Sequence, residues 1–289
     1  MEQTINKKPK YNEIVFTEKQ QNQIIDMYTN QNMSTVKIGK VFDCGNKIIA
    51  KVLESHNIPR TGNSRRKYSL NEFYFDDINT PIKAYIMGFL YADGSNHMPK
   101  STISMSLQEE DKDILERIRN EVGSGKPLEF LDYSNKHDFG YTYKNQYRLL
   151  FFSTHMCRVL SEKGMMQNKS LVLEFPEWLD ESLYSHFIRG YYDGDGSVHF
   201  SEKYKNSILT ITSTENFCLK IKEYIEKTLQ INTYMADASS HNGITRVFGI
   251  SGANQIKTFL DWLYKDADIY LERKYQKYIN KYYNSSQVA

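Results

Sequence analysis

Two nine-residue stretches decide how the chain folds: IMGFLYADG at residues 86–94 and IRGYYDGDG at residues 188–196. Asp93 and Asp195 hold the same place in the two copies, 102 residues apart (195 − 93). Each is followed by Gly and Ser and, four residues after the Asp, by His. A repeat with only two copies indicates a duplicated domain and not a solenoid, which needs about three or more units.

The similarity continues downstream of both stretches. Alternation of polar and apolar residues predicts strands, and apolar residues spaced three and four apart predict the helices that follow them. Each half therefore reads helix, strand pair, helix, strand pair, helix. The predicted strands lie at 102–107, 141–152, 208–212 and 245–250, and the predicted helices at 109–122, 155–160, 214–229 and 254–263.

Both stretches are themselves predicted to be helices that pack against each other. Thr80 can cap the first helix and Pro81 suits its first turn. This helix is apolar nearly all round, which is typical of a buried helix. Small residues four apart on one helix face allow a second backbone to approach closely. The residues expected at this central contact are Gly88, Ala92, Gly190 and Gly194.

Asp93 and Asp195 are then expected at neighbouring helix C-termini, with Gly94 and Gly196 ending the helices in the left-handed conformation. This is an unfavourable place for carboxylates, because the helix dipole is negative there and the two charges repel. A divalent cation relieves both effects, and Mg²⁺ prefers such hard oxygen ligands. Metal-assisted phosphoryl chemistry is the natural use of such a site. The alternative is that Asp-Gly simply marks a turn.

Both stretches resemble the LAGLIDADG motif of homing endonucleases, and the doubled motif resembles the monomeric branch of that family over about residues 80–283. The resemblance implies an α+β fold with two pseudo-twofold-related αββαββα half-domains, 80–179 and 180–289. It also implies a central helix pair and two curved sheets over DNA. It implies that Asp93 and Asp195 bind Mg²⁺ and that both strands are cut with short 3′ overhangs. Asp193 falls one place before the small residue Gly194, so we interpret it as secondary to Asp195 at this site.

The resemblance further implies a lysine late in each half that assists cleavage. Lys169 and Lys274 are 105 residues apart (274 − 169), which fits the repeat. A cation beside the charged transition state of phosphoryl transfer is stabilising. Lys163, Lys265 and Lys277 remain competing choices.

Residues 1–66 are predicted to form a small all-α domain that binds DNA. Thr17 and Ser34 can cap its first two helices, and the pattern resembles a helix-turn-helix with Asp43 where the turn usually has glycine. A plain three-helix adaptor is the alternative. The DNA contacts expected from its third helix are Asn46, Lys47 and Lys51.

A basic tether follows, and charge supports a nucleic-acid partner at this end of the chain. Residues 1–70 hold 12 Lys+Arg and 6 Asp+Glu, a net charge of +6, whereas the whole chain carries +2. Such a segment can follow phosphates or enter a minor groove, or it can be only a flexible linker. Residues 67–79 are predicted to be a linker. The tether contacts expected are Arg60, Arg65, Arg66 and Lys67.

Composition excludes several other classes of protein. The 289 residues are 40% hydrophobic and 25% charged, as in globular proteins. The longest apolar run, 84–92, is too short to span a membrane, and the first residues do not resemble a signal peptide. Three widely spaced cysteines exclude a disulfide framework and a Cys-x-x-Cys zinc site. We expect a cytoplasmic protein.

Together these features predict a monomeric, Mg²⁺-dependent, site-specific double-strand DNA endonuclease encoded by a mobile element, in a host or a phage. A non-cleaving DNA-binding regulator and a maturase that binds intron RNA are the alternatives. Sheet side chains are expected to read base edges. The candidates are Thr102, Ser104, Gln146, Arg148, Thr210, Thr212 and Arg246.

Overall fold

The computed structural model describes residues 14–31, 33–58, 68–134, 137–138, 141–201, 207–238 and 245–284. The chain divides into two compact units, residues 1–68 and 69–289, and each is described by itself. The predicted tether contacts Arg60, Arg65, Arg66 and Lys67 lie outside the described residues.

The smaller unit contains three helices, α1 (Glu18–Thr29), α2 (Thr35–Val41) and α3 (Asn46–Ser55). As predicted, the side chains of Thr17 and Ser34 cap the first two. Between α2 and α3, Asp43 adopts the left-handed conformation with φ 47°, which a short polar side chain tolerates better than most. The helices enclose a small apolar core that includes Ile24, Ile38, Ile49 and Leu53.

The larger unit is a mixed α/β structure with two four-stranded antiparallel sheets, ordered β1-β2-β6-β3 and β7-β8-β10-β9. The predicted order of helices and strands is present in both halves. The first half contains α4 (Pro81–Asp93), β1 (Gly94–His97), β2 (Thr102–Gln108), α5 (Lys112–Glu121), β3 (Glu129–Leu131), β4 (His137–Asp138), β5 (Tyr141–Thr142), β6 (Gln146–Phe152) and α6 (Thr154–Glu162).

The second half repeats the order and adds a helix. Its elements are α7 (Tyr184–Asp195), β7 (Gly196–His199), β8 (Ile208–Thr214), α8 (Glu215–Leu229), β9 (Tyr234–Asp237), β10 (Thr245–Ser251), α9 (Ala253–Tyr264) and α10 (Glu272–Ile279). Short 3₁₀ turns include η2 (Glu109–Asp111) and η3 (Lys169–Leu171). Among the described residues, no helix combines the length and apolarity that crossing a membrane requires.

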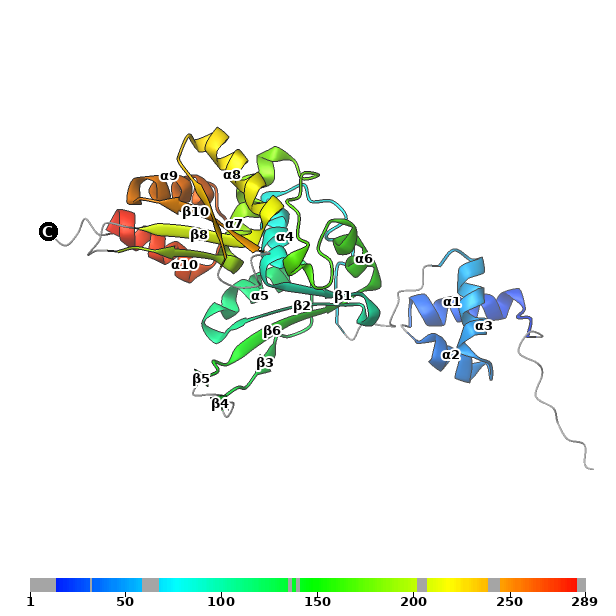
Figure 1. The fold of residues 1–289 in the computed structure, drawn as a ribbon. Helices are drawn as coiled ribbons and strands as arrows, with labels where there is room; N and C mark the ends of the chain where they lie inside the picture. Colours follow the sequence, from blue (N-terminus) through cyan, green and yellow to red (C-terminus); the bar gives the residue numbers. More distant parts are fainter. Residues whose placement is uncertain are drawn as a thin grey trace, which may run out of the picture. The chain divides into compact units, whose positions relative to one another are not determined.

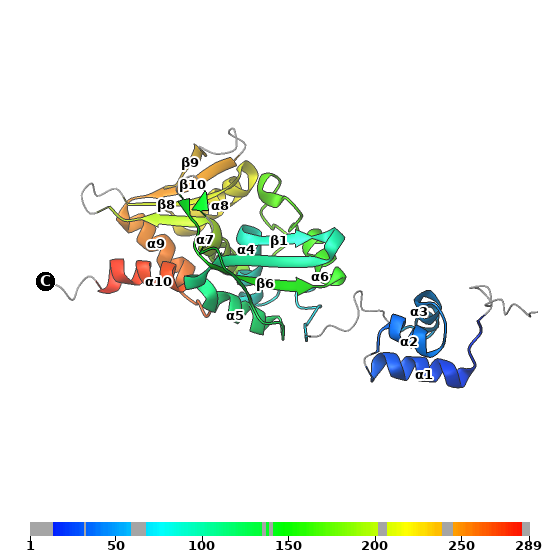
Figure 2. The same ribbon diagram turned by 90° about the horizontal axis from the view of Figure 1, so that it is seen from below.

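Helices α4 and α7 lie side by side at the centre of the larger unit, with one sheet on either side (Figures 1 and 2). Their backbones touch at two glycines. A Cβ atom on Gly88 would lie 2.0 Å from the carbonyl oxygen of Phe187, and one on Gly190 would lie 2.0 Å from that of Tyr85. A Cβ on Gly194 would lie 2.3 Å from the Cβ of Ala92. No larger residue fits at these positions without separating the helices.

The prediction that Gly94 and Gly196 end the helices in the left-handed conformation is wrong. Both have extended backbone, with φ −76° and −78°, because each helix passes directly into a strand. The glycines are needed for space. A Cβ on Gly94 would lie 2.5 Å from the carbonyl oxygen of Leu90, and one on Gly196 would lie 2.2 Å from the ring of Tyr192.

The predicted linker at 67–79 needs a correction as well. Tyr74, Phe75 and Ile78 are buried in the core of the larger unit. Two aromatic rings and an isoleucine within five residues favour burial over exposure to water. The chain joins the larger unit from about residue 69.

We predict that Gly190→Ala destabilises the larger unit. Alanine favours a helix over glycine, so the change stabilises unless the new methyl group meets another backbone. The clash with Tyr85 should lower the free energy of unfolding by about 1–3 kcal/mol. Urea unfolding measures this, with Thr258→Ala on the exposed side of α9 as the control. Equal stability of Gly190→Ala and the parent would contradict the close contact.

Candidate functional site

Two carboxylates meet where the central helices end. Asp93 is the last residue of α4 and Asp195 the last residue of α7. A Cβ atom on Gly194 would lie 3.0 Å from Oδ2 of Asp93, so this carboxylate rests against the last turn of α7. The glycine contact between the helices therefore brings both acidic side chains to one place.

The surroundings of these carboxylates disfavour their charged forms. Burial raises the pKa of Asp93 to about 6, and the charge of Asp195 acts in the same direction. Burial also raises the pKa of Asp195, against the opposing effect of Lys169 and Lys274. Asp93 is partly buried and Asp195 is accessible to solvent. Carboxylates that repel each other at such close range create a demand for positive charge.

Lys169 and Lys274 supply positive charge from the two halves. Nζ of Lys169 donates to the carbonyl oxygens of Ala92 (2.9 Å) and Gly94 (2.7 Å). Nζ of Lys274 donates to those of Tyr192 (2.6 Å) and Gly196 (2.5 Å). Each ammonium group thus binds carbonyl oxygens at the end of a central helix, where the last carbonyls have few or no partners within the helix.

Both lysines are buried, with 9% of Lys169 and 7% of Lys274 exposed. Burial lowers the pKa of both, to about 8 for Lys274, while the nearby Asp side chains oppose this shift. The ammonium groups therefore lie close enough to Asp93 and Asp195 for their charges to interact.

The competing lysines lie elsewhere. Nζ of Lys163 lies 4.8 Å from the centre of the Trp178 ring, and Lys265 is exposed. Nζ of Lys277 donates to the carbonyl oxygen of Val198 in β7 (2.5 Å). Of the five candidate ammonium groups, only those of Lys169 and Lys274 donate hydrogen bonds to the ends of α4 and α7.

Asp193 has a different environment from Asp195. It is fully buried and accepts hydrogen bonds from Oη of Tyr85 (2.9 Å), Oη of Tyr264 (3.0 Å) and the backbone N–H of Leu271 (2.8 Å). Burial raises its pKa to about 6. Since Leu271 precedes α10, Asp193 ties the central helix to the start of the helix that carries Lys274.

Arg189 is a buried residue that the sequence did not single out. Its guanidinium donates to the carbonyl oxygens of Ile269 (3.1 Å) and Leu263 (3.0 Å) and lies over the ring of Tyr85. Met87 holds the matching place in the first stretch, 102 residues earlier (189 − 102). The sequence signal that could have identified Arg189 is an arginine at the position where the first stretch has methionine.

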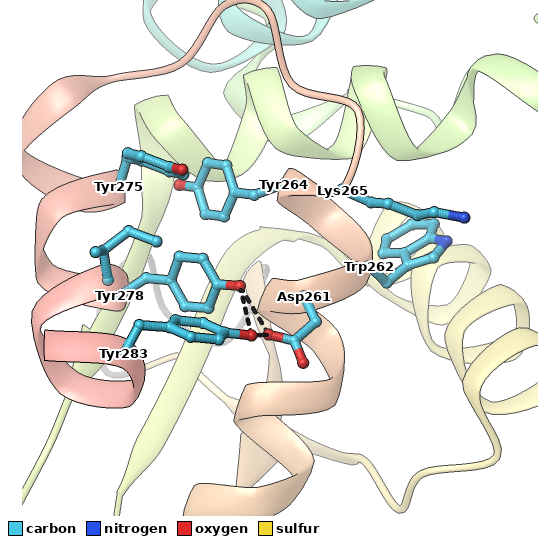
Figure 3. Close-up of a pocket in the computed structure, with 8 residues that line it drawn as sticks. Asp261, Trp262, Tyr264, Lys265, Tyr275, Tyr278 and Tyr283 are labelled. Carbon is cyan, nitrogen blue, oxygen red and sulfur yellow. Dashed lines mark hydrogen bonds between the residues drawn. The ribbon is translucent and has the colours of Figure 1, made fainter. Parts of the chain in front are cut away.

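Tyrosines hold α10 against α9. The rings of Tyr264 and Tyr278 stack with centroids 5.5 Å apart. Oη of Tyr278 and of Tyr283 both donate to Oδ1 of Asp261, at 2.7 and 2.8 Å (Figure 3). These contacts, together with Leu271 and Asp193, set the place of Lys274.

The first sheet presents one polar, uncovered face. The register pairs Thr102 with Phe152, Ser104 with Leu150 and Ser106 with Arg148, so their side chains share a face. None of these residues is buried, whereas Ile103 and Met105 between them are. Arg148 lies 3.7 Å from Glu129 across the sheet. The face includes four predicted base-reading residues, Thr102, Ser104, Gln146 and Arg148.

In the second sheet, Thr210 and Thr212 lie on the same accessible face, whereas Arg246 does not. Thr210 and Thr212 pair with Gly249 and Val247, whereas Arg246 pairs with the buried Ser213. Its side chain therefore points to the opposite face, where it contacts Asp237 (3.3 Å) and Glu215 (3.8 Å). The expected base-reading residues of this sheet are therefore divided between its two faces, because residues one apart in a strand face opposite sides.

The predicted contacts of the smaller unit share an exposed surface. Asn46, Lys47 and Lys51 are exposed on α3. The residues between them on the helix, including Ile48, Ile49 and Ala50, are buried. The three polar side chains are therefore accessible to a partner.

Comparison with known proteins relates these features to a family. Residues 182–262 match the family described as LAGLIDADG-like domain. An uncharacterised protein of Methanocaldococcus jannaschii is 26% identical over 161 residues, which are 54% of this chain and 56% of that protein. The chain thus spans just over half the length of that relative.

Several solved structures are similar as well. Full-length DUF199/WhiA from Thermatoga maritima has a TM-score of 0.44 and 16% identity, over 76% of this chain and 66% of that one, just under two thirds of its length. The I-LtrWI LAGLIDADG homing endonuclease bound to target DNA has a TM-score of 0.43 and 12% identity, over 75% and 92%. The meganuclease I-SmaMI bound to uncleavable DNA has a TM-score of 0.43 and 14% identity, over 71% of this chain and 92% of that one. The segment that matches the LAGLIDADG-like domain family, residues 182–262, contains α7 with Asp193 and Asp195.

Proposed function

We propose that this protein is a Mg²⁺-dependent, site-specific DNA endonuclease of the homing type that cuts both strands and leaves short 3′ overhangs. The observation that supports this most is the convergence of Asp93, Asp195, Lys169 and Lys274 at the paired ends of α4 and α7. The match of residues 182–262 to the LAGLIDADG-like domain family agrees with it.

The donor set fits Mg²⁺ better than a metal held by protein alone. Among the described residues no group of three or more His, Cys, Asp or Glu side chains is placed to hold a metal. Mg²⁺ is commonly bound by one or two carboxylates, with water and substrate phosphate completing its shell. Asp93 and Asp195 would hold it, and the ion would polarise the scissile phosphate and acidify a water molecule.

The protein's own groups then have separate tasks. The ammonium groups of Lys169 and Lys274 offset negative charge that develops at the phosphates, and they act strongly because the site is half-buried. The open sheet faces, with Thr102, Ser104 and Thr210 among their residues, contact base edges. The chain acts as a monomer, since both carboxylates come from one chain.

We further propose that the smaller unit is a helix-turn-helix domain that extends the DNA contact. The exposed side chains of Asn46, Lys47 and Lys51 on α3 support this. The Arg and Lys residues of segment 59–67 would add phosphate contacts that depend on salt.

We predict that Asp93→Asn and Asp195→Asn each abolish double-strand cutting. Loss of one carboxylate removes a metal ligand but no base contact, so DNA affinity should stay within about tenfold, roughly 1.4 kcal/mol. The assay selects sites from a random DNA library with Mg²⁺ or EDTA and sequences the ends. Undiminished cutting by either variant would overturn the metal assignment.

The same assay separates the alternatives. Mg²⁺-dependent breaks in both strands support the endonuclease. DNA binding without breaks would indicate a regulator, and retention of intron RNA with no cut DNA would indicate a maturase.

We predict that Asp93→Asn stabilises the protein at neutral pH in EDTA. A carboxyl with a pKa raised to about 6 keeps its proton to a higher pH in the folded state than in the unfolded chain. Folding stability from this group is therefore present at low pH and is lost as pH rises through about 6. Removing the charge should add about 1–3 kcal/mol at pH 7.5 and only about 0.5 kcal/mol at pH 4.

Urea unfolding at both pH values tests this difference. Asp77→Asn, which changes an exposed carboxylate, is the control and should alter stability by less than about 0.5 kcal/mol. An Asp93→Asn variant less stable than the parent at pH 7.5 would show that the carboxylate is stabilising.

We predict that deleting residues 1–68 weakens DNA binding and flattens its salt dependence while some cutting remains. Fewer phosphate contacts release fewer counterions, so the slope of log affinity against log salt should fall. Binding titrations at several salt concentrations measure this. A truncated protein that binds its site as tightly as the full chain would refute the role of the smaller unit.

A further inference from the structure

The start of α10 is held by an ion pair with the other half of the larger unit. Nε of Arg273 lies 3.0 Å from both carboxylate oxygens of Asp111, which is at the N-cap position of α5. The Asp111 side chain is 5% exposed and that of Arg273 is 51% exposed. Loss of the partner of a buried carboxylate leaves its charge uncompensated, which is strongly destabilising, so this ion pair should hold Arg273 in place. We call this contact the anchor.

Arg273 directly precedes Lys274, so the anchor acts on the lysine through one peptide bond. The backbone N–H of Lys274 donates to the carbonyl oxygen of Leu271 (3.0 Å), and the N–H of Leu271 donates to Asp193 (2.8 Å). The turn that carries Lys274 is thus held from one side by Asp193 of its own half and from the other by Asp111 of the first half.

The second half also contacts the segment that follows Lys169 in the first half, through an uncharged hydrogen bond. Thr214, at the N-cap of α8 in the second half, donates from Oγ1 to the carbonyl oxygen of Leu173 (2.5 Å). Leu173 follows Lys169 by four residues, just after η3. The residue before Lys169 is the uncharged Asn168. A charged pair therefore acts in one direction and a hydroxyl–carbonyl bond in the other.

We propose that Asp111 and Thr214 are positioning residues, through which each half places the lysine of the other: Asp111 places Lys274, and Thr214 places Lys169. Each ammonium group then reaches the end of its central helix only when the two halves are docked. Only the consequence for DNA cleavage rests on the proposed function, because the placement of the lysines is a property of the chain itself.

Lysine acylation of the full chain tests the placement directly. N-hydroxysuccinimidyl acetate is the probe, and mass spectrometry gives separate labelling rates for Lys169 and Lys274. Buried amines react through local opening. Asp111→Asn should speed labelling of Lys274 by about tenfold and leave Lys169 within about twofold, and Thr214→Val should do the reverse.

The crossed pattern distinguishes positioning from general loosening. Equal acceleration at both lysines, or none at either, would overturn the proposal. Thr214 also accepts a bond from the N–H of Phe217, so Thr214→Ser, which keeps the hydroxyl, should restore the parental rates. Glu162→Gln removes the partner of Arg158 within α6 and should change neither lysine. If Asp111→Asn does not fold, Arg273→Lys replaces it, with the same selective rise expected at Lys274.

A second readout connects the placement to cleavage. On a supercoiled plasmid with the selected site, Asp111→Asn should accumulate circles nicked in one strand, and Thr214→Val circles nicked in the other. Equal slowing of both strands would contradict the directed pairing. If the parent protein cuts no DNA, the proposed function fails, while the labelling result still decides whether each half places the other's lysine.

Discussion

The backbone contact between α4 and α7 is the constraint on which the rest of the larger unit depends. A methyl group on either Gly88 or Gly190 would lie 2.0 Å from a carbonyl oxygen of the opposite helix. Contact this close brings the two helix ends together and, with them, Asp93 and Asp195. The same contact fixes the distance between the two sheets that flank the helix pair. An interface of larger side chains would separate the two carboxylates.

The closeness of the helix ends creates an electrostatic problem that the two lysines reduce. Carboxylates at helix C-termini meet the negative end of the dipole and each other. Lys169 and Lys274 lie there because carbonyl oxygens at each helix end bind their ammonium groups. The lysines thus have a structural task before any substrate is present.

The two halves share an order of elements but differ in how they are held. Asp193 and Arg189 form a buried polar network in the second half, whereas Tyr91 and Met87 stand at the corresponding places in the first. α10 has an ion pair to the first half, and the segment after Lys169 has a hydroxyl bond to the second.

The sequence by itself determined the repeat, the cap of the first central helix, the order of helices and strands along each half and the matching places of Asp93 and Asp195, because these depend on local periodicity and spacing. Only the tertiary structure decided that Gly94 and Gly196 are needed for space, that residues 69–79 enter the core and that Arg246 faces away from Thr210. It alone placed Asp111 beside Arg273. Those outcomes depend on which backbone or side chain arrives from a distant part of the chain, and no local pattern records that.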